Sequence, residues 1–212
     1  APERGGLVEL NSADVFQCFG RAGRPQYDTS GEAVLITGDH ALLPRYLAML
    51  TSALPLDSKL VGGLPDALNA EIASGTVSNM HEAAEWLSYT FLFVRMMRSP
   101  TSYGIPYDER ERDPTLMRAR LKMVALAVKR LEDARMVRSH RSATEQLNPA
   151  APLAATDLGR IASHFYVHHE TVEKLFLEGL NPRMTDAELL EAVCTRAKEF
   201  EQIKVREEEV PE

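Results

Sequence analysis

Apolar side chains in the second half of the chain recur at helical spacing. The clearest run follows Asp113-Pro114, where intervals of three and four residues place one apolar stripe on a helix that reaches about residue 131. The stripe consists of Met117, Leu121, Val124, Val128 and Leu131. Such a stripe indicates a helix that packs against a core by one face.

The same kind of spacing predicts further helices at residues 60–74, 79–98, 156–166, 169–179 and 185–200. Gly75 is expected to end the first of them, and Pro65 inside it predicts a kink or a restart. Asn79 is the expected cap of the second. The residues that should bury one face of that second helix are Trp86, Leu87, Val94 and Met97.

Two short extended pieces, at residues 136–139 and 152–154, follow the long helix. Three helices with a small β-ribbon favour a winged-helix arrangement. The first fifty residues differ, because an apolar, partly β-branched segment at residues 32–37 predicts a buried strand between a helix at 13–19 and a helix that Asp39 caps. One strand cannot form a sheet, so its partner strands are expected outside this chain.

The composition is ordinary, but the net charge is misleading because the charges are unevenly distributed along the chain. The 212 residues are 44% hydrophobic and 26% charged, as in ordinary globular proteins, and no apolar run approaches the ~20 residues that span a bilayer. The formal charge of −7 hides an excess of six positive charges between residues 110 and 141 and of six negative charges after residue 165. A polyanionic partner is therefore not excluded.

Targeting signals and cysteines bear on where such a protein would work. No basic segment followed by an apolar run is seen at the start, so no secretory signal is expected in the sequence given. Cys18 and Cys194 are far apart and cannot form a disulfide framework or a metal site alone, which favours a reduced, intracellular setting.

The most informative motif is the stretch from Gln17 to Arg24, QCFGRAGR. Arg21 and Arg24 would place two guanidinium forks at the end of a helix, and each fork can bind phosphate oxygens in bidentate fashion. Gly20 and Gly23 let the backbone turn tightly or approach a ligand closely. The alternative is a surface loop whose arginines pair with acidic neighbours.

The motif resembles motif VI of superfamily-two helicases, Q-x-x-G-R-x-G-R, and the likeness extends along nearly the whole chain. It is carried by GRAGRPQYDTSGEAVLIT, LNAEIASGTV, WLSYTFLFVRM, SPTSYGI, TDLGRIASHFYV and FEQIKVREEE. Together these segments are similar to the first cassette of Ski-two-like helicases with tandem cassettes. Members of this family couple ATP hydrolysis to 3′-to-5′ translocation along a single strand.

The resemblance implies a mainly α fold with minor β structure, made up of parts of three domains. Residues 1–54 would end the second RecA-like α/β domain, residues 55–155 would form the winged-helix domain, and residues 156–212 would begin the helical ratchet bundle. Partners would be RNA or DNA, the upstream RecA-like domain of the same protein and a multi-subunit nuclear or cytoplasmic complex. No membrane partner is expected.

The resemblance also implies roles for the motif. Arg24 would be the arginine finger, Arg21 a second phosphate contact, and Gln17 a nucleotide neighbour, with Gly20 and Gly23 shaping the loop. The cofactors would be ATP and Mg²⁺. The chain has neither a phosphate-cradling Gly-Lys-Ser/Thr loop nor an Asp-Glu pair after a buried strand, so the Mg²⁺ ligands would lie outside it and the chain alone should not hydrolyse ATP.

Other candidate residues have simpler explanations. Arg118, Lys122 and Lys129 share one face of the long helix and could follow nucleic-acid phosphates. A solvated face, or one that docks on a RecA-like domain, is the favoured interpretation. Tyr89, Phe91, Phe93 and Tyr103 could stack on bases, but core packing is favoured at helical spacing.

The histidines His164, His168 and His169 are close in sequence, yet two ligands on one helical turn need further partners, so no metal site is expected. His164 is expected to be packed or to cap a helix, and Ser163-His164 has no acid at triad-like spacing. Two functional alternatives remain open: a non-catalytic platform for protein interactions, and a plain winged-helix nucleic-acid binder that would leave Gln17 to Arg24 unexplained.

Overall fold

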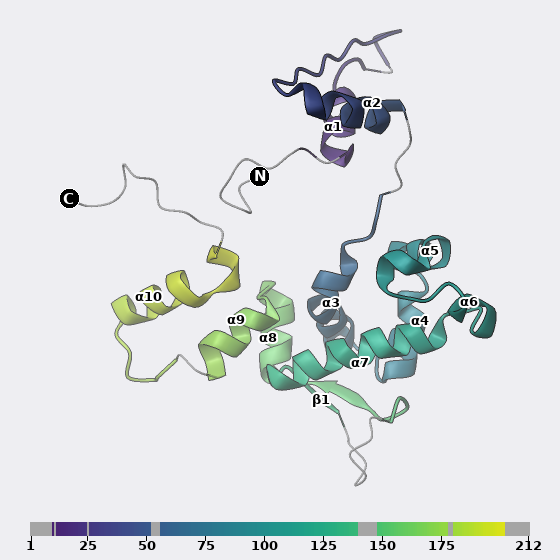
Figure 1. The fold of residues 1–212 in the computed structure, drawn as a ribbon. Helices are drawn as coiled ribbons and strands as arrows, with labels where there is room; N and C mark the ends of the chain where they lie inside the picture. Colours follow the sequence, from purple (N-terminus) through teal and green to yellow (C-terminus); the bar gives the residue numbers. More distant parts are fainter. Residues whose placement is uncertain are drawn as a thin grey trace. The chain divides into compact units, whose positions relative to one another are not determined.

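The computed structural model describes residue 10 and residues 12–24, 26–51, 56–139, 148–177 and 180–201. The chain divides into two compact units, residues 1–57 and residues 58–212. Each unit is described by itself. The predicted fold class, mainly α-helical with a small β component, is confirmed (Figure 1).

The first unit contains α1, a short 3₁₀ turn (η2) and α2. Their bounds are Ser12–Phe19, His40–Leu42 and Leu43–Thr51. The predicted cap is confirmed, because the Asp39 side chain accepts a hydrogen bond of 2.8 Å from the backbone N–H of Ala41.

The predicted buried strand at residues 32–37 is wrong for this structure. The segment is not paired into a strand, and Val34 and Ile36 are 81% and 90% exposed. A strand needs a neighbour to satisfy its backbone groups and cover its side chains. The described residues of this unit supply none, so the apolar sequence stays extended and uncovered.

The second unit consists of helices around one β-hairpin. Its elements up to the hairpin are α3 (Leu60–Ser74), α4 (Met80–Leu87), α5 (Phe91–Arg98), the 3₁₀ turn η3 (Pro100–Tyr103), α6 (Glu109–Arg112) and α7 (Met117–Asp133). The later elements are β1 (Val137–Ser139), β2 (Leu153–Ala155), α8 (Asp157–Phe165), α9 (His169–Val172), a π-helical turn η4 (Glu173–Leu177), α10 (Asp186–Arg196) and η5 (Lys198–Phe200).

Capping and breaking residues explain where several of these helices begin and end. Gly75 ends α3 in the left-handed conformation at φ 81°, as predicted. Of the predicted kink or restart at Pro65, the restart is wrong, because α3 runs through that residue and buries it, and the kink stays a prediction. The single helix expected at residues 79–98 is also wrong: a turn after Leu87 ends α4, and Thr90 caps α5 through its hydroxyl.

The hairpin lies beside the long helix α7 (Figure 1). Its two strands are antiparallel, with Val137 opposite Ala155 and Ser139 opposite Leu153. An isolated bridge from Asn79 to Pro152 ties β2 to the start of α4. Helices followed by this two-stranded ribbon form the predicted winged-helix arrangement.

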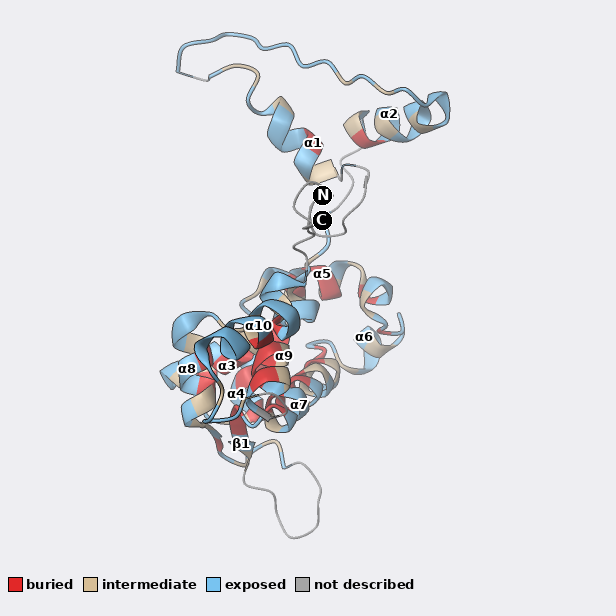
Figure 2. Ribbon diagram, turned by 90° about the vertical axis from the view of Figure 1, so that its left-hand side faces the viewer, coloured by how far each residue is buried: buried red, intermediate tan, exposed pale blue. Residues whose placement is uncertain are grey.

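The core lies where α3, α4 and α7 meet, and Figure 2 shows the buried residues concentrated there. Val124, Val128 and Leu131 of the predicted stripe are fully buried, while Met117 and Leu121 pack at its edge. None of the described helices is long and apolar enough to cross a membrane.

Three apolar residues were wrongly expected in this core. Val94 is 43% exposed, Phe91 is 55% exposed and Tyr89 is 90% exposed. They lie on or just before α5, whose opposite face buries Leu92 and Met96. Helical spacing alone could not show which face of this short helix turns inward.

A glycine sets how closely α8 approaches the hairpin. A Cβ added at Gly159 would overlap the backbone carbonyl of Met136 and lie 2.8 Å from Asn69 Oδ1. The close approach lets Asn69 of α3 donate a hydrogen bond of 2.9 Å to the Gly159 carbonyl oxygen. Gly159 therefore joins the winged helix to the helices that follow.

Candidate functional site

The two motif arginines lie on a turn at the end of α1. The backbone N–H of Gly20 donates to the Phe16 carbonyl at 2.8 Å, and that of Arg21 donates to the Cys18 carbonyl at 3.1 Å. Gln17, Arg21 and Arg24 are all exposed. The turn thus presents both arginines and the glutamine to solvent.

A closed loop fixes the backbone at the second arginine. The Arg24 backbone N–H donates to Asp28 Oδ2 at 2.8 Å, and the Asp28 N–H donates back to the Arg24 carbonyl at 2.7 Å. Gly23 has a φ of 103°, which L side chains rarely adopt. Gly31 crosses so close to Ala22 that a Cβ there would overlap the Ala22 carbonyl oxygen.

The side chains of this turn remain available to a ligand. Within the described part of the chain, neither the Arg21 nor the Arg24 guanidinium forms an ion pair or a hydrogen bond. Two such forks on one rigid turn can grip an anion with several oxygens, such as a phosphate group. The roles expected of Gln17, Gly20, Arg21, Gly23 and Arg24 stay predictions.

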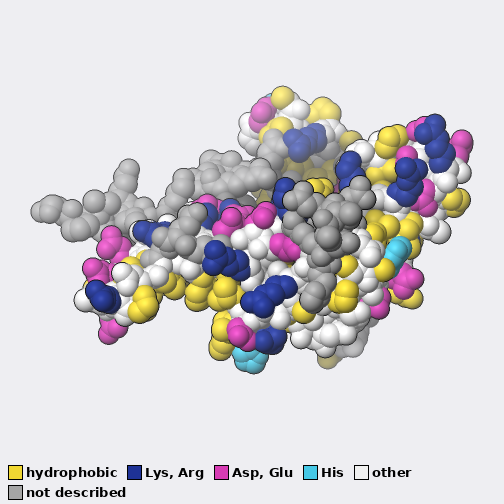
Figure 3. Space-filling model, turned by 90° about the horizontal axis from the view of Figure 1, so that it is seen from below, with side chains coloured by type: hydrophobic (Ala, Val, Ile, Leu, Met, Phe, Trp, Pro, Cys, Tyr) yellow, Lys and Arg dark blue, Asp and Glu magenta, His cyan; other side chains and the backbone are white. Residues whose placement is uncertain are grey.

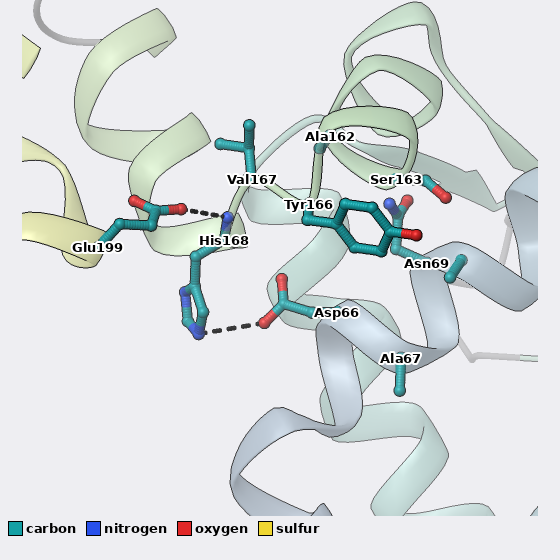
Figure 4. Close-up of a pocket in the computed structure, with 10 residues that line it drawn as sticks. Asp66, Ala67, Asn69, Ala162, Ser163, Tyr166, Val167, His168 and Glu199 are labelled. Carbon is teal, nitrogen blue, oxygen red and sulfur yellow. Dashed lines mark hydrogen bonds and ion pairs between the residues drawn. The ribbon is translucent and has the colours of Figure 1, made fainter.

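A second polar cluster joins α3 to the start of α9. The His169 backbone N–H donates to Asp66 Oδ1 at 2.8 Å, and His169 Nδ1 lies 3.0 Å from Asp66 Oδ2. His168 Nε2 lies 3.1 Å from the same Oδ2 (Figure 4). Burial raises the pKa of the Asp66 carboxyl, but the bonds from His169 and the charges of both histidines lower it below its ordinary value overall.

These three residues are also the group that could hold a metal ion among the described residues. One ligand atom from each of Asp66, His168 and His169 lies within 4.8 Å of the others. The two imidazoles are stacked, with centroids 4.5 Å apart and planes at 29°, and each directs one ring nitrogen at Asp66 Oδ2. His168 Nδ1 accepts the Glu170 N–H, which leaves the proton of the neutral ring on Nε2, facing Asp66. The geometry fits hydrogen bonding better than coordination.

The structure corrects the interpretation of the histidines. His164 is exposed on α8 and was wrongly expected to be packed or to cap a helix. His168 is the cap, and His169 is buried. Asp66 was missed by sequence reasoning, because it is one of two carboxylates in the mainly apolar stretch of residues 60–74 and nothing local distinguishes it.

The basic face of α7 carries its three predicted residues on the surface. Arg118, Lys122 and Lys129 are exposed, and Arg118 has a long ion pair of 4.0 Å with Glu109. On the face of the molecule in Figure 3, Lys and Arg side chains have Asp and Glu side chains among them. Exposed Leu126 lies on the same helix. The assignment of these three residues to nucleic acid stays a prediction.

Comparison with known families identifies the two parts of the second unit. Residues 57–133 match the profile of a winged helix-turn-helix domain, and residues 155–212 match that of a Sec63 Brl domain. The chain is thus a segment in which a winged helix precedes a Sec63 domain. The predicted boundaries after residues 54 and 155 are not tested further and stay predictions.

Curated relatives extend the likeness over the whole chain. The activating signal cointegrator 1 complex subunit 3 of Dictyostelium discoideum is 44% identical over 210 residues, which cover 99% of this chain and 9% of that protein. The human protein of the same name is 43% identical over 212 residues, again 9% of its length. The human U5 small nuclear ribonucleoprotein 200 kDa helicase is 43% identical over 209 residues, 99% of this chain and 9% of the relative.

These findings confirm the family that the sequence resembles. The relatives of this chain are Ski-two-like helicases, among them the cointegrator complex subunit and the U5 small nuclear ribonucleoprotein helicase. The chain spans about a tenth of the length of these relatives.

Proposed function

We propose that this chain is part of an ATP-dependent 3′-to-5′ nucleic-acid helicase and that it supplies the arginines that contact the ATP phosphates. Arg24 acts as the arginine finger, Arg21 is a second phosphate contact, and Gln17 lies beside the nucleotide. Mg²⁺ is held by residues outside this chain. The substrate is an RNA or DNA duplex.

The observation that carries the proposal is the pair of exposed arginines on a turn whose backbone is closed by Asp28 and Gly31. A phosphate-contacting arginine acts by stabilising the charge that develops during transfer, so it must be both free of internal ion pairs and held in place. The turn meets both conditions among the described residues. One of the relatives is named a helicase, which favours the same activity here.

The experiment is nucleic-acid-stimulated ATP hydrolysis by the full-length protein. Arg24→Ala is expected to lower kcat by about three to five orders of magnitude, the contribution of an arginine finger, with little change in nucleic-acid binding. Arg45→Ala, which removes another exposed arginine of the same unit, should retain activity. Normal turnover in Arg24→Ala would contradict the assignment and favour a non-catalytic interaction platform.

The isolated 212 residues provide a second check. They should show no ATP turnover above background, because the phosphate-binding loop and the Mg²⁺ ligands belong elsewhere. Turnover by this chain that disappears in Arg24→Ala would contradict the proposal. We also propose a nuclear or cytoplasmic multi-subunit complex as the setting, since the relatives are named as a complex subunit and a ribonucleoprotein component.

A further inference from the structure

A pocket of about 400 Å³ lies where α3, the end of α8 and the start of α9 meet. Figure 4 shows the Tyr166 ring, the Asp66 carboxylate and the Glu199 carboxylate around the same space, with His168 between the two carboxylates. Val167 and alanines provide apolar walls. All residues that line the pocket belong to the second unit.

The polar groups of the pocket are mainly hydrogen-bond acceptors. Both carboxylates have pKa values below their ordinary ranges: burial raises each, but hydrogen bonds from His169 to Asp66 and from His168 and Thr171 to Glu199 outweigh it. Both are therefore ionised at neutral pH. Among the described residues, neither carboxylate has a Lys or Arg partner.

The charges nearby do not cancel this excess. Lys198 pairs with Glu170 and Glu201, and Lys174 pairs with Glu201. These four groups neutralise one another, so no lysine compensates the charges of Asp66 and Glu199. A phosphate backbone would be repelled here.

Tyr166 adds an aromatic surface in a costly conformation. It adopts the left-handed region, at φ 58° and ψ 38°, and is 91% exposed at the pocket. Bulky residues rarely adopt this conformation, and such strain occurs most often at functional positions. Aromatic faces attract cations, arginine above all because its planar group also stacks.

We infer that this pocket binds the side chain of an arginine from a basic segment of a partner protein. The guanidinium carries five donors and no acceptor, which matches two carboxylates and an aromatic ring. The carboxylates would bind its N–H groups, the Tyr166 ring would pack against its plane, and the alkyl stem would lie on the apolar walls.

The test is NMR titration of the 212-residue chain, labelled with ¹⁵N, with N-acetyl-arginine amide. Shifts are expected at the amides of Val167, His168 and Glu199, and they should weaken as salt is raised. N-acetyl-citrulline amide, which has nearly the same shape but no charge, should cause no comparable shifts. Equal shifts with citrulline, or no shifts at these amides with arginine at tens of millimolar, overturn the inference.

Two variants and one control separate binding from folding. Tyr166→Asn retains a residue suited to the left-handed conformation and should weaken arginine binding at least about threefold through loss of the aromatic face. Glu199→Gln should weaken it further, whereas Glu191→Gln, which removes an exposed charge on α10, should not change it. Wild-type affinity in both Tyr166→Asn and Glu199→Gln overturns the inference, as does a single-stranded oligonucleotide that shifts the same amides.

Discussion

The imidazole Nδ1 of His169 lies 3.0 Å from the Asp66 carboxylate, although 103 residues separate the two along the chain. With the bond from the His169 backbone and the contact from His168, this carboxylate fixes the start of α9 against α3. The winged helix and the first turn of the next helical segment are therefore held together by one acidic side chain as well as by apolar packing.

Asp66→Asn should lower the free energy of unfolding at pH 7 by about 1–3 kcal/mol, because hydrogen bonds to a charged acceptor are lost and an amide N–H₂ would face the imidazole N–H groups. Urea unfolding followed by circular dichroism measures the difference. Asp157→Asn is the control, since that carboxylate is 90% exposed, and it should change stability by less than about 0.5 kcal/mol. Equal stability of Asp66→Asn and the wild type would contradict the role of the cluster.

The pH dependence of that difference follows from the lowered pKa of Asp66. A carboxyl whose pKa is lower in the folded state than in the unfolded state stabilises the fold above its ordinary value of 3.8, and this contribution is lost as the pH falls through the folded pKa. The gap between the wild type and Asp66→Asn should shrink below about pH 4, where the wild-type carboxylate becomes protonated. A gap that does not shrink below about pH 4 would contradict the role of the ionised carboxylate.

Gly159→Ala should be among the most damaging small substitutions in the chain. The added methyl group would overlap the Met136 carbonyl and approach Asn69 Oδ1, both held by packed elements, so a loss of about 3 kcal/mol or more is expected. Gly63→Ala is the matched control within α3, because nothing lies within 4 Å of its Cβ position. It should stabilise the helix by about 0.5–1 kcal/mol. Thermal unfolding of both variants distinguishes the two cases.

Glycine substitution at two residues in the left-handed conformation should change the stability of the fold in opposite directions. Tyr166→Gly removes strain from a side chain that is 91% exposed and should stabilise the fold by about 1 kcal/mol. Leu116→Gly relieves similar strain at φ 51° but empties a fully buried site, with an expected net loss of about 2 kcal/mol or more. The midpoints of thermal unfolding should therefore move in opposite directions. A lower midpoint for Tyr166→Gly would show that its side chain contributes to folding.

The basic face of α7 can be tested by charge reversal. Lys122→Glu combined with Lys129→Glu should leave the affinity of the 212 residues for single-stranded RNA or DNA unchanged, because exposed Leu126 and the ion pair of Arg118 with Glu109 favour a solvated or docking face. Fluorescence anisotropy over a range of salt concentrations measures this. A tenfold weaker affinity, with a salt dependence reduced by about two phosphate contacts, would instead establish a phosphate-binding stripe.

Sequence patterns predicted correctly the features that depend on residues close together along the chain. The stripe from Met117 to Leu131 predicted α7 and its buried face, and Asp39 and Gly75 marked helix ends correctly. The arginine turn could be recognised from eight consecutive residues, because its spacing and glycines are properties of one short segment.

Features that depend on distant partners were missed or misjudged. The apolar segment at residues 32–37 needs neighbouring strands that the described residues do not supply, so its composition predicted a burial that does not occur. Phe91 and Val94 could not be assigned to a face from spacing alone, because two helices replace the expected single one.

By itself, the sequence determined the helical stripes, the caps and the motif that places this chain in its family, since each depends on residues within a few turns of one another. Only the tertiary structure brought Asp66, His168 and Glu199 together around one pocket. Their separation along the chain is bridged by the packing of α3 against α8 and the close approach at Gly159. Hydrogen bonds between such distant residues, and the burial of their side chains, depend on the packed fold. They cannot be predicted from a local pattern in the sequence.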